Sequence, residues 1–245
     1  MRFRLKAFSV HLLLSACVAL CSLYLVFMVW HPNPLQKAVG VTHIFLILLG
    51  VDVVIGPLFT LLVASSKEKK TLKFDLTIIA LLQISAYLYG MHSIVISRPV
   101  YLAFDKVRVD LVQADSVFRD PAKTVSPEYQ RNPWFKPEWV AIRPYKDANE
   151  QSRRTFMELQ DGISPAMQAD LYEPLESAWS EINTAKHHLE ELKKYNIPER
   201  VDTILSQYPQ ADSYLPLKGS VNDETVLLDS KTKTIVAVVD LQPWS

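Results

Sequence analysis

Three long apolar stretches in the first hundred residues constrain this chain more than any other feature. They cover residues 8–30, 39–63 and 76–96, which are 23, 25 and 21 residues long. At about 1.5 Å of rise per residue, a helix of each length reaches roughly 30 Å, the thickness of the hydrocarbon core of a bilayer. A buried helix of a soluble protein would show a polar stripe over such a length. The sequence therefore predicts a membrane region over residues 1–96 with three transmembrane helices.

The distribution of charge separates this region from the rest of the chain. The whole sequence carries 26 basic and 26 acidic side chains. Residues 1–96 have eight Lys and Arg against three acids, whereas residues 97–245 have 18 against 23. This balance excludes a protein that binds nucleic acid through an overall positive field, and we expect no nucleic-acid partner. The remaining 149 residues are the size of one ordinary domain.

Basic residues on the short flanks predict the orientation in the membrane. Three of them precede the first stretch and four lysines lie in the second connection, residues 65–73, whereas the first connection, residues 31–38, has only Lys37. Because short cytoplasmic segments are enriched in Lys and Arg, we expect the N-terminus and the second connection in the cytoplasm. Three spans then place residues 97–245 on the opposite side, which is the periplasm in a Gram-negative bacterium.

The N-terminal stretch also contains a sequence that matches a lipoprotein cleavage site, Leu14-Ser15-Ala16-Cys17. A cleaved signal peptide would need the apolar run to end there, but the run continues through Trp30. We therefore expect an uncleaved first helix. Cys17 and Cys21 are the only cysteines of the chain, so the exported domain contains no disulfide.

Asp52 places a carboxylate at the middle of the second stretch, the depth at which a charge is most costly. Gly56 and Thr60 follow at i+4 and i+8, so the three residues share one helix face. Small and hydroxyl residues are typical of close helix contact in lipid. One interpretation buries this face inside a three-helix bundle, and the other has it bind a membrane helix of another protein. The other stretches offer polar faces too, formed by His11, Ser15 and Ser22 in the first and by Asp75, Gln83 and Gly90 in the third.

The exported part changes from strand patterns to helix patterns and back to strand patterns. The predicted elements are strands over residues 100–104 and 107–113, helices over 147–160, 164–172, 175–195 and 198–208, and strands over 225–228 and 234–241. This order indicates an α+β domain whose first and last strands share one sheet. The predicted fold is therefore three transmembrane α-helices followed by one periplasmic α+β domain.

Residues 120–145 contain five prolines and cannot form one regular helix. Trp134, Phe135 and Trp139 make this segment too apolar for a free linker. Two interpretations stay open for these aromatic residues. They complete the core of the domain, or they form an exposed ridge that binds a partner.

No constellation for catalysis is present in the sequence. His187 and His188 are adjacent, with Glu191 close behind, but neighbouring residues on a helix point about 100° apart and make poor ligands for one metal ion. No phosphate-binding glycine motif and no GxSxG occurs. We expect no enzymatic activity, no catalytic residue, no cofactor and no metal site.

Four segments together resemble the TfpX/TfpZ family of type IV pilin accessory proteins. They are VGVTHIFLILLGVDVVIGPLFTLLV (39–63), LKFDLTIIALLQISAYLYG (72–90), RPVYLAFDKVRVDLVQADSV (98–117) and the closing YLPLKG…ETVLLDSKTKTIVAVVDLQPW (214–244). The resemblance runs from the first span to Trp244 and is weakest over residues 146–210.

The resemblance implies a bacterial inner-membrane protein that acts as a pilin-specific chaperone, binding and stabilising the major type IV pilin before or during pilus assembly. A modulator of pilus extension and retraction is the main alternative, and a membrane-anchored enzyme or a ligand sensor is a more distant one. The implied partners are the transmembrane helix and periplasmic head of the major pilin, other pilus assembly components, and the lipid bilayer. The candidate pilin-contacting residues are Asp52, Gly56, Thr60, Trp134, Phe135 and Trp139.

Overall fold

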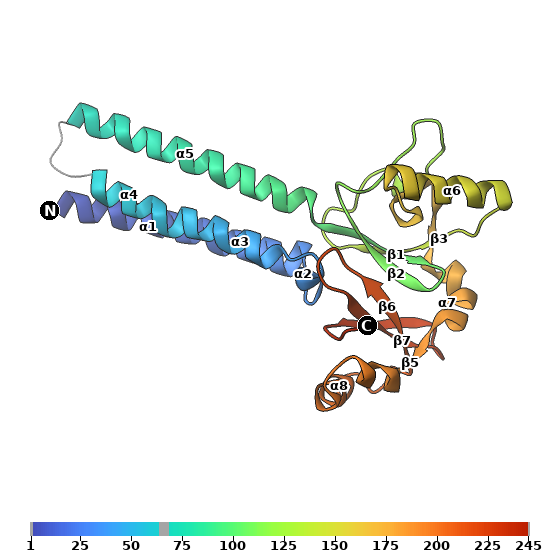
Figure 1. The fold of residues 1–245 in the computed structure, drawn as a ribbon. Coiled ribbons are helices and arrows are strands. Elements are labelled where there is room, and N and C mark those ends of the chain that lie inside the picture. Colours follow the sequence, from blue (N-terminus) through green and yellow to red (C-terminus); the bar gives the residue numbers. More distant parts are fainter. Residues whose placement is uncertain (1, 64–68, 245) are drawn as a thin grey trace. The chain divides into compact units, whose positions relative to one another are not determined.

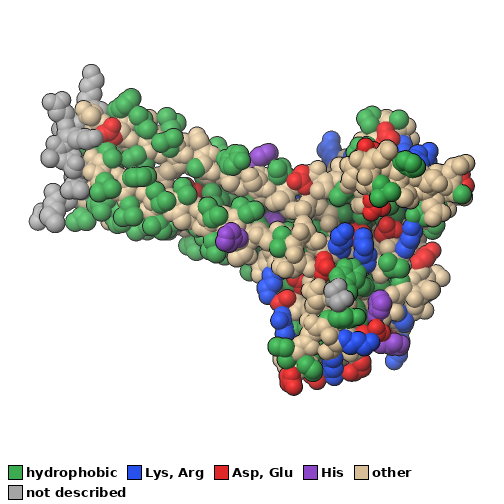
Figure 2. Space-filling view, viewed as in Figure 1, with side chains coloured by type: hydrophobic (Ala, Val, Ile, Leu, Met, Phe, Trp, Pro, Cys, Tyr) green, Lys and Arg blue, Asp and Glu red, His purple; other side chains and the backbone are tan. Residues whose placement is uncertain are grey.

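The computed structural model describes residues 2–63 and 69–244, which form two compact units. The helical unit comprises Met1–Val29 and Gly40–Ile96, and the sheet domain comprises Trp30–Val39 and Ser97–Ser245. The predicted fold class is confirmed, because three long apolar helices are followed by an α+β domain (Figure 1). Figure 2 shows apolar side chains over the helical unit and charged side chains of both signs over the sheet domain.

The helical unit contains the three predicted spans. The segments long and apolar enough to cross a membrane are Leu5–Trp30, Val41–Val63 and Thr71–Ile96. Their helices are α1 (Arg2–Tyr24) with a π-helical end (Leu25–Trp30), then α3 (Val41–Leu49), a π-helix (Gly50–Ile55) and α4 (Gly56–Val63), and finally α5 (Lys69–Ile96). Of the predicted second connection, residues 65–68 lie outside the described residues and residues 69–73 already belong to α5.

The second span changes its hydrogen-bond pattern around Asp52. The π-helix Gly50–Ile55 ends directly before Gly56 and Pro57. Proline has no amide hydrogen, and its ring displaces the carbonyl four residues earlier, so the regular α-helical bond to Val53 cannot form at this position. A π-helical turn accommodates the change without ending the helix, and such turns are common at functional positions.

One mixed sheet organises the sheet domain. Its strand order is β4-β3-β1-β2-β6-β7-β8, with β5 paired to β6. The pairs β1·β3 and β2·β6 are parallel and the other pairs are antiparallel. The strands are β1 (Pro99–Asp105), β2 (Arg108–Gln113), β3 (Glu138–Ile142), β4 (Tyr172–Pro174), β5 (His187–His188), β6 (Ser213–Lys218), β7 (Glu224–Asp229) and β8 (Thr234–Val239). The first and last strands therefore share one sheet, as predicted.

Both faces of the sheet are buried. In β1, Leu102 and Phe104 enter one hydrophobic cluster while Tyr101 and Ala103 enter another. This alternation follows from the two-residue period of a strand. Val107, which the sequence analysis included in the second strand, lies in the turn before β2 and is 61% exposed.

Short helices cover the sheet. The helix α6 (Ala148–Asp161) begins and ends one residue later than predicted. The side chain of Asp147 accepts a hydrogen bond from the amide of Glu150, and Gly162 ends the helix with a left-handed φ of 69°. The helix α8 (Pro198–Leu205) is shorter than predicted by about one turn. The predicted helix over 164–172 is replaced by two 3₁₀ turns, Pro165–Met167 and Ala169–Leu171.

The predicted long helix over residues 175–195 is wrong. The segment consists of a 3₁₀ turn (Leu175–Ala178), helix α7 (Trp179–Ala185), strand β5 and a second 3₁₀ segment (Leu189–Lys194). Its apolar residues have helical spacing, but they fill separate parts of the core. Ile182 belongs to one hydrophobic cluster and Leu192 to another, and the strand pairing of β5 with β6 lies between them.

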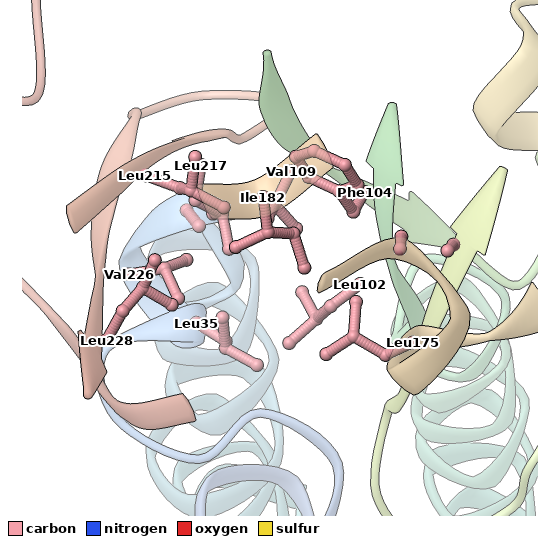
Figure 3. Close-up of a cluster of buried hydrophobic side chains, with 13 residues drawn as sticks. Leu35, Leu102, Phe104, Val109, Leu175, Ile182, Leu215, Leu217, Val226 and Leu228 are labelled. Carbon is pink, nitrogen blue, oxygen red and sulfur yellow. The ribbon is translucent and has the colours of Figure 1, made fainter. Parts of the chain in front are cut away.

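The first connection is part of the sheet domain, which differs from the predicted division at residue 96. Helix α2 (Leu35–Ala38) buries Leu35 and Ala38 in the same cluster as Val226 and Leu228 of β7. Figure 3 shows Leu35 among the side chains that converge there from the sheet, together with Leu175 and Ile182. Residues 30–39 group with the sheet domain because their apolar side chains complete its core.

Candidate functional site

A cavity of about 280 Å³ lies inside the helical unit. Its walls come from α1, from α3 with the following π-helix, and from α5, and most of the lining is aliphatic or aromatic. The polar side chains that line it are His11, Ser15, Ser22, Asp52, Gln83 and Tyr87. We call it the membrane cavity.

Asp52 is the acidic group of the membrane cavity. Its Oδ1 is buried and has no hydrogen-bond partner among the described residues. The backbone carbonyl of Asp52 accepts a bond of 3.4 Å from Nε2 of Gln83, whose own Oε1 is also buried and unpartnered within the part of the chain that the structure describes. A polar oxygen in an apolar environment strongly favours a hydrogen-bond donor. The cavity can therefore accept a donor group from a segment that enters it.

Gly56 and Thr60 lie on the same helix face as Asp52, and both are buried within the helical unit. Oγ1 of Thr60 is 2.6 Å from Nδ1 of His11 in α1. A Cβ at Gly56 would overlap the side-chain amide of Gln83 in α5. Contacts between the helices of this unit therefore account for Gly56 and Thr60, whereas Asp52 opens onto the cavity. Contact of these three residues with a pilin stays a prediction.

The polar residues of the first and third spans meet across the same cavity. Oγ of Ser22 is 2.7 Å from the hydroxyl of Tyr87 and also donates to the carbonyl of Val18 at 2.8 Å. The pattern of polar residues in the sequence indicated His11, Ser22 and Gln83 but not Tyr87. The available signal was its position four residues after Gln83, which places both side chains on one face of the helix.

Of the three aromatic residues in the proline-rich segment, one packs on the core and two are exposed. Trp139 lies in β3, is half-buried and packs against the core cluster that contains Leu102. Trp134 and Phe135 lie in the loop before β3 and are 54% and 68% exposed. The core interpretation therefore describes Trp139, and the exposed ridge consists of the other two residues.

A second cavity, of about 300 Å³, lies in the sheet domain where the parallel strands β1 and β3 end. Two cations lie over the ring of Tyr145 there, with Lys106 Nζ 4.1 Å and the Arg154 guanidinium carbon 4.9 Å from its centroid. Glu150 accepts bonds from Arg143 at 2.6 Å and from Arg154 at 3.0 Å. The bond from Arg143 is the largest cause that holds the pKa of Glu150 well below its usual range.

The adjacent histidines lie on a strand rather than on the predicted helix. The ring of His187 stacks on Tyr214 with centroids 5.2 Å apart, and His188 precedes the 3₁₀ segment that begins at Leu189. Successive residues of a strand point to opposite faces, so the two rings diverge. Within residues 2–63 and 69–244, no group of three or more His, Cys, Asp or Glu side chains is arranged to hold a metal ion.

The family model described as fimbrial assembly protein FimB matches residues 1–40. A fimbrial assembly protein of Dichelobacter nodosus, serogroups C1 and C2, is 34% identical over 119 residues, which cover 48% of this chain and 91% of that protein. This chain belongs to the fimbrial assembly protein family.

Two longer relatives match nearly the whole of this chain. The Dichelobacter nodosus fimbrial assembly proteins of serogroup I and serogroup E1 are 29% and 28% identical over 249 residues, which cover 99% of this chain and 96% of each relative. No solved structure matches the chain. The likeness therefore includes both the helical unit and the sheet domain.

Proposed function

We propose that this fimbrial assembly protein is a non-catalytic accessory protein of the bacterial inner membrane that binds the major type IV pilin and stabilises it before or during pilus assembly. The observation that carries the proposal is the membrane cavity, in which a buried carboxylate oxygen has no partner among the described residues. In a member of the fimbrial assembly family, the expected occupant is a membrane segment of the assembled subunit. The N-terminus is cytoplasmic and the sheet domain periplasmic in this proposal, in agreement with the basic flanks.

The two units offer two kinds of contact. A type IV pilin that waits in the membrane exposes one apolar helix and an exported globular head. The mainly apolar lining of the membrane cavity suits apolar side chains of that helix, and the sheet domain is exported to the compartment of the head. Two linked contacts raise the effective concentration of each other, so neither contact needs to be strong by itself. Such binding suits an accessory factor that releases the pilin for assembly.

Asp52 is the residue that gives the contact its selectivity. A desolvated carboxylate forms a strong, charge-assisted hydrogen bond with a cationic donor, such as the N-terminal amine of the pilin. An apolar helix that lacks a donor would leave the oxygen of Asp52 unpartnered and would bind less well. The contact therefore distinguishes a pilin helix from other apolar helices of the membrane.

Substitution of Asp52 by asparagine tests the proposal. Asp52→Asn keeps the size of the side chain but removes its ability to carry a negative charge. We expect less major pilin to co-purify with the variant, while the variant itself accumulates in the membrane at the normal level. Gly50→Ala is the matched control, because it lies in the same π-helix and a Cβ there meets no atom within 4 Å. Loss of the Asp52→Asn variant from the membrane would instead make Asp52 an internal structural residue.

A further inference from the structure

A loop of the sheet domain exposes two neighbouring aromatic side chains. Residues 131–136 form the loop before β3, and we call them the Trp134 loop. Trp134 and Phe135 are 54% and 68% exposed at its tip, and the exposed cations Arg131 and Lys136 flank them. Adjacent exposed aromatic residues on a folded domain mark an interaction surface.

Buried side chains hold this loop in place. The hydroxyl of Tyr101 donates a bond of 3.1 Å to the carbonyl of Arg131, and Nη2 of Arg98 donates a bond of 3.3 Å to the carbonyl of Pro133. Tyr101 is fully buried and Arg98 is 6% exposed. The backbone is thus anchored on both sides of the tip, so the exposed rings are presented by a fixed loop.

Trp134 contacts two residues that lie at the ends of membrane spans. Its ring is in edge contact with the ring of Trp30, with centroids 6.0 Å apart, and Trp30 is the last residue of the first span. The guanidinium carbon of Arg98 is 4.8 Å from the centroid of the Trp134 ring, and Arg98 is the second residue after Ile96, the end of the third span. Because two residues of extended chain reach at most about 7 Å, Arg98 lies no more than about 7 Å beyond the end of the third span.

These contacts place the Trp134 loop beside the ends of two candidate spans. The polar headgroup layer occupies roughly 5–7 Å on each side of the hydrocarbon core. We therefore expect a side chain that touches the last residue of one candidate span and the second residue beyond another to lie in that layer. Tryptophan is enriched in this layer of membrane proteins, and Arg and Lys side chains reach lipid phosphates from it.

We propose that the Trp134 loop inserts into the headgroup layer of the periplasmic leaflet, with Trp134 and Phe135 on the acyl boundary and Arg131 and Lys136 on phospholipid phosphates. This inference goes beyond the proposed function, because it requires membrane insertion of the spans and no pilin. It also assigns Trp134 and Phe135 to lipid rather than to the pilin contact that the sequence analysis considered. The loop then anchors the sheet domain to the membrane surface whether or not pilin is bound.

A spin-label measurement tests this assignment on the full chain without pilin. In a Cys17→Ala, Cys21→Ala background, one nitroxide is attached at Phe135→Cys and, in a separate protein, at Ile197→Cys. The two native side chains are equally exposed, at 68% and 67%, so Ile197 is the matched control. The purified proteins are placed in vesicles of phosphatidylethanolamine and phosphatidylglycerol. We expect the label at 135 to collide more with oxygen and less with a water-soluble nickel chelate than the label at 197.

Equal collision of both labels with the nickel chelate would overturn the assignment. Protection of the label at 135 that appears only after purified pilin is added would also overturn it and would make the loop a pilin contact. A second measurement uses the chain with its native cysteines. Lipids brominated near the headgroup should quench the fluorescence of the native protein more than that of Trp134→Phe, and equal quenching would contradict the proposal.

Discussion

The amide of Val221 donates a hydrogen bond of 2.8 Å to the carbonyl of Ala38, which joins the loop between β6 and β7 to the first connection. Nδ2 of Asn222 also donates to the carbonyl of Lys37 at 3.1 Å. A Cβ at Gly219 would lie 2.8 Å from the same carbonyl of Ala38, so this close approach requires glycine. Residues 30–39 are thereby a structural part of the sheet domain, and the chain passes between the two units three times.

The first prediction concerns Leu35, which is 4% exposed in the core cluster of the sheet domain. Leu35→Ala should lower the free energy of unfolding of this domain by about 2–5 kcal/mol, because it removes buried methyl groups and leaves a cavity. Chemical unfolding of the detergent-solubilised chain, followed by tryptophan fluorescence, measures the change. The control Leu159→Ala removes the same atoms from a side chain that is 80% exposed in α6, and we expect almost no change there. Equal losses would contradict the placement of residues 30–39 in the core.

The second prediction compares two glycines of one span. Gly56→Ala should reduce the stability of the helical unit, because the new methyl group overlaps the side chain of Gln83. Gly50→Ala should be neutral or slightly stabilising, since its surroundings are open. Thermal aggregation in detergent and the steady-state amount in the membrane measure both variants.

A compensating substitution tests the stated cause of the Gly56 effect. Gln83→Ala removes the atoms that the methyl group would meet, so it should restore the stability of Gly56→Ala. Failure of this rescue would show that another contact of Gly56 is responsible.

The third prediction concerns Glu224 in β7, which is 1% exposed. Neither of its carboxylate oxygens has a hydrogen-bond partner among the residues that the structure describes. Burial is the main cause that raises the pKa of Glu224 to about 8, and the nearby charge of Asp240 raises it further, while Lys37 and Arg200 lower it. The folded domain therefore favours the protonated form.

The raised pKa of Glu224 should make the stability of the sheet domain fall as the pH rises. Below the pKa of the unfolded chain, near 4.3, both states are protonated and Glu224 has no effect on stability. As the pH rises toward 8, the unfolded state ionises first and the domain loses stability. Glu224→Gln should remove this loss, so its stability relative to the native protein should rise by on the order of 5 kcal/mol between pH 4 and pH 9. The exposed Glu176→Gln is the control, and a pH-independent difference for Glu224→Gln would contradict the prediction.

Sequence periodicity predicted the elements whose residues face one environment along their whole length. The three spans are uniformly apolar, and α6 has both a capping Asp147 and a terminal Gly162, so their positions were clear. The β7–β8 hairpin was predicted for the same reason, since each strand is a short run of β-branched and aliphatic residues. These are local signals that do not depend on the partner of an element.

The missed elements depend on long-range partners. Strand β6 contains Pro216, which argues against a strand inside a sheet, yet its neighbours pair with β7 and β2. The 175–195 segment has helical spacing, but pairing of β5 with the distant β6 interrupts it. In the candidate site, the spacing of Asp52, Gly56 and Thr60 predicted that they share one helix face. It did not predict which residues of the other helices contact that face. Only the structure shows that the side chain of Gln83 packs against Gly56 and that His11 contacts Thr60.

The lifetime of the major pilin in the membrane tests the central claim most directly. A pulse–chase experiment compares newly made pilin in cells with the native protein, with no protein, and with Asp52→Asn. The proposed function predicts that pilin is synthesised at the same rate in all three strains but is degraded faster in the last two. An unchanged pilin lifetime without the protein would contradict a stabilising role and would favour an action on pilus extension and retraction.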